Sequence, residues 1–298
     1  MSQPTPVKGV ILAAGYGTRF LPVTKTVPKE MLPIVEVPSI QYVIDEFTAS
    51  GIREILIITS RRKRALEDYF DRDVELESVF RDEGASGKLA SVTPPDANVV
   101  FIRQREMGGT AHALMLCEGF AGQTPFVVAY PDDLMPDPPC ARQLIETWRE
   151  TITPERPRGC SVLSVIDLSG QDVSRYGVVD FELQGGRHVV RRMVEKPRPG
   201  SEPSHLISLG RYLYTPDLFP VLHELAREPR DGEFYQTEPI NRLAGRGLVV
   251  AQPYPGRRYD TGEPIGYIKT IVEMALARPE YRQEMSNYLR NLSLTGDL

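Results

Sequence analysis

Short apolar segments alternate with amphipathic segments through the first half of the chain, and this alternation constrains the fold more than any other feature. Four apolar runs carry no charge: residues 10–13, 55–58, 99–102 and 126–130. Runs of this kind are typical of strands covered on both faces. Between the first two, apolar side chains recur at helical spacing: Ile40, Val43, Ile44 and Phe47. Repeated βα units predict an α/β fold with a mostly parallel, doubly wound sheet flanked by helices.

The pattern changes at about residue 160. Strand-like segments there are separated by glycine-rich turns: residues 161–165, 177–183 and 189–194. We expect them to add antiparallel strands to the sheet. Helical patterns return at residues 216–225, 238–244 and 264–277. Residues 71–98 are polar and predict a long irregular excursion, either a mobile lid or an assembly element. Because no proline-rich linker interrupts the chain, we expect residues 1–298 to form a single domain.

Composition excludes several classes of protein. The 298 residues carry a formal net charge of −5, whereas a nucleic-acid binder usually has a basic surplus. No apolar run approaches the roughly 20 residues that span a bilayer. The three cysteines are odd in number and lack metal-ligand spacing, which favours free thiols in a reducing compartment. The first residues carry no apolar signal core, so we expect a cytoplasmic protein that binds neither nucleic acid nor membrane.

A glycine-rich loop with three cations follows the first apolar run. Gly15 and Gly17 would let backbone N–H groups approach phosphate closely. Arg19, Lys25 and Lys29 could then reach different phosphates of one polyphosphate. The loop matches neither the Walker A pattern nor G-x-G-x-x-G. A plain βα turn with solvated cations is the alternative, but the interleaved prolines favour cations held in fixed positions.

Polar side chains also follow three other predicted strands. Asp132 and Asp133 come after the run at 126–130, where ligands bind in open α/β sheets, and such carboxylates suit Mg²⁺. A capped Asp-Asp turn is an equally weighted alternative. Gln104, after the run at 99–102, offers both a hydrogen-bond donor and an acceptor to a ligand. Glu195 and Lys196 could hold a sugar hydroxyl and a phosphate, or form only a surface ion pair.

The segment from Gly15 to Pro33 resembles the signature of bacterial UTP–glucose-1-phosphate uridylyltransferases, a branch of the sugar nucleotidyltransferase family. The shared motif is Gly15-x-Gly17-Thr18-Arg19, and the ending Pro28-Lys29-Glu30-Met31-Leu32-Pro33 is characteristic of the uridylyl branch. The resemblance runs along nearly the whole chain. It implies the Rossmann-like nucleotide-diphospho-sugar transferase fold, with a nucleotide-binding half at about residues 7–150. A sugar-binding and C-terminal helical half would cover about residues 151–298.

The resemblance also implies a reaction and a set of residues. UTP and α-D-glucose 1-phosphate would give UDP-glucose and pyrophosphate by in-line attack on the α-phosphate, with Mg²⁺ held by Asp132 and Asp260. Arg19, Lys29 and Lys196 would be catalytic. Sugar-binding residues would be Gly177, Glu195 and Gly210. Relatives assemble, so we expect a homodimer or homotetramer. The implied nucleotide-binding residues are Ala14, Gly15, Gly17, Thr18, Glu30, Gln104 and Gly109.

The chain departs from the family pattern at several positions. Ala111 replaces a glycine and is expected to narrow the base pocket, and Thr261 replaces a cysteine beside Asp260. Tyr235 stands where a glutamine is usual on the sugar side. Two alternatives therefore remain: the same chemistry with dTTP or another hexose 1-phosphate, and a catalytically silent paralogue that binds nucleotide-sugar. A glycosyltransferase is disfavoured, because it would typically carry Asp-x-Asp rather than Asp-Asp.

Overall fold

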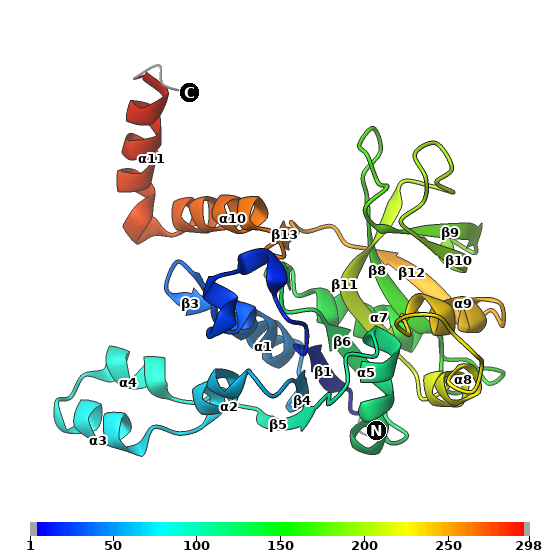
Figure 1. Ribbon diagram of the computed structural model, residues 1–298, viewed down its shortest axis with the longest axis horizontal. Coiled ribbons are helices and arrows are strands. Elements are labelled where there is room, and N and C mark those ends of the chain that lie inside the picture. Colours follow the sequence, from blue (N-terminus) through cyan, green and yellow to red (C-terminus); the bar gives the residue numbers. More distant parts are fainter. Residues whose placement is uncertain (1–4, 295–298) are drawn as a thin grey trace.

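A nine-stranded mixed sheet runs through the molecule (Figure 1). The computed structural model describes residues 5–294. The strands, in spatial order, are β5 (Asn98–Arg103), β4 (Glu54–Thr59), β1 (Lys8–Leu12), β6 (Phe126–Ala129), β11 (Leu206–Tyr214), β8 (Ser161–Asp167), β12 (Val249–Pro253), β10 (Arg187–Glu195) and β9 (Gly177–Gln184).

The sheet confirms the predicted α/β class. The first four apolar runs form β1, β4, β5 and β6, which pair in parallel. The predicted antiparallel additions are present, since β9 and β10 form a hairpin and β11 runs against both β6 and β8. The sequence analysis did not identify β11 as a strand, although it joins the two halves of the sheet.

Helices cover both faces of the sheet, and the side chains of β1 show why. Ile11 belongs to one buried cluster and Val10 to the other, because successive strand residues point to opposite faces. Buried residues of α1 (Ser39–Ala49) and α7 (Cys140–Glu150) belong to the first cluster. Those of α5 (Thr110–Leu116), α8 (Leu218–Leu225) and α9 (Thr237–Ala244) belong to the second. Four further helices are α2 (Arg64–Phe70), α6 (Glu118–Ala121), α10 (Pro264–Ala277) and α11 (Pro279–Leu294).

The prediction of an irregular excursion at residues 71–98 is wrong. This segment forms α3 (Val74–Asp82) and α4 (Ser86–Val92), which pack on each other and project from the body beyond α2 (Figure 1). The Asp73 side chain accepts a hydrogen bond from the Leu76 backbone N–H (3.0 Å) and caps α3. The helices were missed because each is short and carries few apolar side chains, most of which are exposed.

The three cysteines are free and buried, which makes their reactivity testable. Burial raises the pKa of the Cys117 thiol to about 12 and raises that of Cys140 further. At pH 8 a thiol with a pKa of 12 is ionised to about one part in ten thousand, and the thiolate is the reactive form. The native protein is therefore expected to leave all three thiols unreacted in a DTNB titration at pH 8, with full reaction after denaturation. Stoichiometric labelling of the native protein would contradict this.

Candidate active site

The glycine-rich loop is folded into three consecutive 3₁₀ turns, which span Thr18–Phe20, Val23–Lys25 and Lys29–Met31. Gly17 begins the first turn with a φ of 67°, a conformation that favours glycine. Its carbonyl accepts a hydrogen bond from Thr24 Oγ1 (2.8 Å), which closes the loop on itself. The loop is thus held by its own turns before any ligand binds.

Two of the three loop cations contact the segments that carry the predicted aspartates. Lys29 forms an ion pair with Asp132, and Arg19 Nη1 donates a hydrogen bond to the Gly262 carbonyl (3.3 Å). Lys25 ends the second turn and is exposed. The fold therefore places Arg19 and Lys29, but not Lys25, beside the carboxylates.

Asp132 and Asp260 face the same small space. Asp132 follows β6, while Asp260 lies on β13 (Tyr259–Asp260), which pairs with β7 (Asp133–Leu134). A Cβ built on Gly262 would lie 3.2 Å from Asp132 Oδ2 and 3.2 Å from Asp260 Oδ1. Thr261 ties the two segments together, because its backbone N–H (2.8 Å) and hydroxyl (2.9 Å) both donate to the Asp132 carbonyl.

The paired aspartates after β6 have different surroundings. Asp133 is buried and accepts hydrogen bonds from the Gly210 backbone N–H (2.7 Å) and from Arg258 Nε (2.6 Å). Arg258 also reaches Asp260 Oδ2 (3.2 Å), so it links Asp133 to the carboxylate on β13. Sequence reasoning assigned no role to Arg258, although it lies two residues before Asp260. Asp132 therefore faces the site, whereas Asp133 holds the neighbouring Gly210 and Arg258 in place.

The pKa values follow these contacts. Burial by itself would raise the pKa of the Asp132 carboxyl, but the charge and hydrogen bond of Lys29 outweigh burial, and the pKa is lowered. Burial would likewise lower the pKa of Lys29, yet Asp132 and Glu30 raise it. Burial dominates at Asp133, whose pKa is raised although Arg258 acts in the opposite direction. Asp132 and Lys29 are therefore both charged at neutral pH.

Asp132 and Asp260 are carboxylates that could together hold a hard divalent cation. Mg²⁺ in such sites takes one or two carboxylates and completes its coordination with substrate phosphates and water. Within residues 5–294, no group of three or more His, Cys, Asp or Glu side chains could hold a metal ion by itself. The donor set therefore matches a cation that binds together with a phosphorylated substrate.

A cavity of about 300 Å³ brings together the predicted base-reading residues. Ala14, Gly15, Gln104 and Gly109 line it, together with Lys29 and Asp132. Gln104 Nε2 donates to the Gly109 carbonyl (3.1 Å), which fixes the amide against the loop. A Cβ on Gly109, whose φ is 94°, would lie 2.4 Å from the Phe234 carbonyl oxygen, so only glycine fits there. Ala111 was expected to narrow the base pocket. In the structure it is wholly buried and does not line the cavity.

Two further cavities adjoin the first. One of about 290 Å³ is lined by Arg19, Asp132, Gly210 and Asp260, and one of about 210 Å³ by Gly177, Glu195 and Tyr235 among others. Tyr130 lines all three cavities, so they meet at the carboxyl end of β6. The predicted metal-binding aspartates and the predicted sugar-binding residues line these cavities, as do four of the predicted nucleotide-binding residues, whereas Gly17, Thr18 and Glu30 do not.

Lys196 lies just outside these cavities. It follows β10 with a φ of 46°, and its exposed ammonium is 3.9 Å from Glu195 Oε1. A lysine in the left-handed region is strained, and such strain clusters at functional sites. The backbone N–H of Lys196 donates to the Tyr176 carbonyl (3.0 Å), which holds this turn in place.

Glu30, expected to bind nucleotide, is instead placed in a buried ion pair. Both of its carboxylate oxygens accept hydrogen bonds from Lys63 Nζ (2.7 and 2.8 Å), and Lys63 also donates to the Ala13 carbonyl (2.5 Å). Burial lowers the pKa of the Lys63 ammonium, and Glu30 offsets only part of that effect. Sequence reasoning missed Lys63; its position shortly after β4, at the carboxyl end of the sheet, was the available signal. The pair joins the base pocket to the turn that carries Lys29.

A second buried ion pair lies directly behind the site. Arg211 on β11 and Glu46 on α1 are 0% and 3% exposed, and three hydrogen bonds of 2.9–3.1 Å join them. Arg211 Nη1 also donates to the Tyr130 carbonyl (3.0 Å). This pair therefore braces the turn from which Asp132 projects.

Comparison with known proteins agrees with this geometry. Residues 8–275 match the family model described as "Nucleotidyl transferase". The chain belongs to the nucleotidyl transferase family. It is 40% identical over 291 residues to a UTP–glucose-1-phosphate uridylyltransferase of Staphylococcus epidermidis, covering 96% of this chain and 98% of the relative. A second relative, from Staphylococcus saprophyticus, is also 40% identical over 291 residues, with the same coverage.

Solved structures of the family have the same fold. The UTP-bound UGPase of Acinetobacter baumannii matches with a TM-score of 0.84 and 29% identity, over 96% of this chain and 99% of that one. A UDP-glucose pyrophosphorylase complexed with UDP-glucose matches with a TM-score of 0.78 and 36% identity, over 92% and 100%. The predicted family membership and fold of this nucleotidyl transferase are therefore confirmed.

Proposed function

We propose that this nucleotidyl transferase is a UTP–glucose-1-phosphate uridylyltransferase, which makes UDP-glucose and pyrophosphate. One observation carries the proposal: Asp132 lines both the cavity that holds Gln104 and the cavity that holds Asp260 and Arg19. A nucleoside in the first cavity would therefore present its phosphates to the carboxylates and cations of the second. The names of the relatives, which are UTP–glucose-1-phosphate uridylyltransferases at 40% identity, support this choice of substrates.

The proposed reaction needs positioning and charge neutralisation rather than an acid–base residue. A phosphate oxygen of glucose 1-phosphate attacks the α-phosphorus of UTP, a new P–O bond forms, and the bond to the leaving pyrophosphate breaks. A bound Mg²⁺, held by Asp132 and Asp260, would neutralise phosphate charge. Arg19 and Lys29 stabilise the triphosphate. Lys196 attracts the sugar phosphate, while Gly177, Glu195 and Gly210 form the sugar side.

The remaining nucleotide contacts are assigned to the loop and the base pocket. Gln104 and Gly109 read the uracil edge, with Ala14 and Gly15 beneath it. Gly17 and Thr18 offer backbone N–H groups to the phosphates. We assign Glu30 a positioning role, because its carboxylate is occupied by Lys63. Residues 7–150 would then supply the nucleotide side of one domain and residues 151–298 its sugar side.

A substrate panel tests the assignment. Pyrophosphate release would be measured with Mg²⁺ for UTP, dTTP, CTP, ATP and GTP, each with glucose, galactose, mannose and N-acetylglucosamine 1-phosphates. We expect UTP with glucose 1-phosphate to give the highest kcat/KM. A higher value for dTTP would reassign the nucleotide, and binding of UDP-glucose without any release would identify a silent paralogue.

One residue favours testing a second hexose. Tyr235 is half exposed and lines the sugar cavity at the position where glutamine is usual. A phenol in place of an amide changes both the size of the cavity and the hydrogen bonds that it offers to a sugar hydroxyl. The same chemistry with another hexose 1-phosphate is therefore the second candidate function, and the panel separates the two.

Replacing Lys63 is expected to weaken UTP binding. In Lys63→Met the buried carboxylate of Glu30 loses its partner, so the Lys29 turn and the Ala13 backbone lose their common anchor. We expect the KM for UTP to rise about tenfold or more, the equivalent of about 1.4 kcal/mol, with a smaller change in kcat. Lys63→Arg, which keeps the charge, should recover most of the loss. Equal KM values for the Met and Arg variants would contradict this role.

The C-terminal helix α11 has an exposed surface that bears on assembly. Between Pro279 and Leu292, α11 contains no buried side chain, and Tyr281 and Tyr288 are exposed on it. An exposed amphipathic helix of this kind supports self-association, and we propose a homodimer or homotetramer.

Within residues 5–294, no helix has the length and apolar character to cross a bilayer. The free thiols and the nucleotide substrate support a cytoplasmic location.

A further inference from the structure

A second large cavity has four arginines in its lining. It measures about 890 Å³ and lies at the carboxyl ends of β4 and β5, beside the base pocket. Gln104 and Met107 line both this cavity and the base pocket, so the two cavities are neighbours. The other lining residues are Tyr16, Ser60, Arg61, Arg62, Ile102, Arg103 and Arg105. None of the residues assigned to phosphate, metal or sugar binding is among them.

Arginines dominate the cavity, and most of them lack an acidic partner. Arg103 forms an ion pair with Glu67 on α2 (3.1 Å). Among residues 5–294, by contrast, no carboxylate forms an ion pair with Arg61, Arg62 or Arg105. Like charges around one cavity repel each other, and this protein has a net charge of −5 that could have supplied counter-charges. An anionic ligand would relieve that repulsion.

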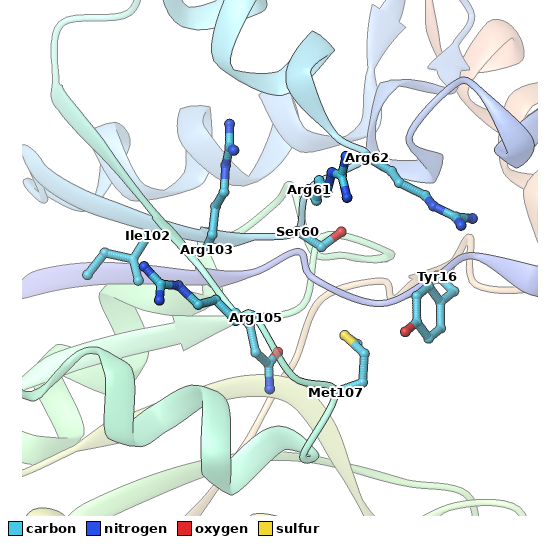
Figure 2. Close-up of a pocket in the computed structure, with 9 residues that line it drawn as sticks. Tyr16, Ser60, Arg61, Arg62, Ile102, Arg103, Arg105 and Met107 are labelled. Atoms are coloured by element: carbon cyan, nitrogen blue, oxygen red, sulfur yellow. The ribbon is translucent and has the colours of Figure 1, made fainter.

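The shape and the other walls restrict what the anion can be. A concave volume of this size suits a small molecule. In Figure 2, Tyr16 and Arg62 lie on one side of the opening and Arg105 and Ile102 on the other. The Tyr16 side chain is 61% exposed, and with Met107 it offers an apolar surface on which a flat ring could pack. Guanidinium groups bind phosphate oxygens bidentately and also stack on planar rings.

We propose that this arginine-lined cavity is a second, effector site that binds a nucleoside phosphate. Its phosphate is held by Arg61 and Arg105, and its base packs against Tyr16. Occupation is coupled to the catalytic site through two shared elements. Tyr16 belongs to the glycine-rich loop, and Gln104 forms part of the base pocket. A bound effector therefore changes the affinity for UTP.

The test uses the full-length protein and AMP, a nucleotide that the catalytic site is not proposed to use. Calorimetric titration of AMP would be carried out with the catalytic site saturated by UDP-glucose, whose binding is measured separately first. We expect AMP to bind this complex. The double variant Arg61→Ala/Arg105→Ala should weaken that binding tenfold or more, because each lost phosphate contact is charge-assisted. The matched control is Arg191→Ala, an exposed arginine on β10 that pairs with Glu182.

Two results would overturn the proposal. One is an absence of AMP binding to the UDP-glucose complex, or equal binding by the double variant. The other is a KM for UTP that saturating AMP leaves unchanged in the unmodified protein. Inorganic phosphate serves as a second probe, and AMP is expected to bind more tightly than phosphate because its ring packs against Tyr16; equal affinities would contradict the role of Tyr16. Failure of UDP-glucose to bind would instead refute the proposed catalytic function, so the two failures are distinguishable.

Discussion

Replacing Asp132 by asparagine is expected to reduce pyrophosphate release by roughly 10²–10³-fold or more. Asp132 forms the ion pair with Lys29 and faces Asp260 across Gly262. Removing its charge takes away a carboxylate from the proposed cation site and the group that orients Lys29. The rate would be measured with saturating UTP, glucose 1-phosphate and Mg²⁺. A variant that keeps more than about a tenth of the activity would contradict the role given to Asp132.

Asp132→Asn should leave the fold intact, because the Lys29–Asp132 pair is partly exposed, and such pairs contribute only about 0–1 kcal/mol. The neighbouring aspartate provides the matched control. Asp133→Ala removes a buried acceptor from Gly210 and Arg258, which costs about 1–3 kcal/mol for each group left unpaired. Thermal unfolding should therefore separate the two variants: near-normal stability for Asp132→Asn and a clear loss for Asp133→Ala. The opposite order would mean that the two roles are exchanged.

Replacing Glu46 by glutamine is expected to give the largest loss of stability, about 3–5 kcal/mol in the free energy of unfolding. The change leaves the guanidinium of Arg211 charged, wholly buried and without its counter-ion. In the unmodified protein the Ala141 backbone N–H donates a hydrogen bond to Glu46 Oε1 (2.9 Å). The substitution also weakens this hydrogen bond. Urea unfolding followed by circular dichroism would measure the loss.

A double variant distinguishes loss of the pair from loss of packing. Glu46→Leu combined with Arg211→Met replaces the pair by apolar side chains, and it should recover most of the stability lost by Glu46→Gln alone. Glu182→Gln, which breaks an exposed pair with Arg191, serves as the control and should cost less than about 1 kcal/mol. A single Glu46→Gln variant as stable as this control would refute the importance of the buried pair.

Much of the fold could be predicted because it depends on local patterns. The four apolar runs of the first half and the hairpin of β9 and β10 are visible in consecutive residues. The strand β11 was missed, because its sequence contains glycine and arginine within an otherwise apolar run. Arg211 is acceptable in the middle of a buried strand only because Glu46 lies opposite, and no local pattern shows that. The helices α3 and α4 were missed for the opposite reason, since they bury little.

In the candidate site, too, some residues could be predicted from local sequence and others only from tertiary contacts. The glycine-rich loop singled out Lys29, the position after a predicted strand singled out Asp132, and the family resemblance singled out Asp260. Asp132 and Asp260 meet beside Gly262 only in the folded chain, through contacts such as that of Thr261 with Asp132, which lies 129 residues away. The roles of Lys63 and Arg258 likewise depend on residues far away in the chain. The arginine-lined cavity is likewise invisible in the sequence, because its arginines follow two strands that become neighbours only in the sheet.

By itself, then, the sequence determined the α/β class, the glycine-rich loop and the family. These follow from hydrophobic periodicity and from residue types at fixed spacing, which are properties of neighbouring residues. Tertiary structure alone decided which charges are buried in pairs, as Glu30 with Lys63 and Glu46 with Arg211, and which face the cavities. The physical reason is that the environment of a charge depends on strand order and on burial, and both are set by contacts between residues far apart in the chain.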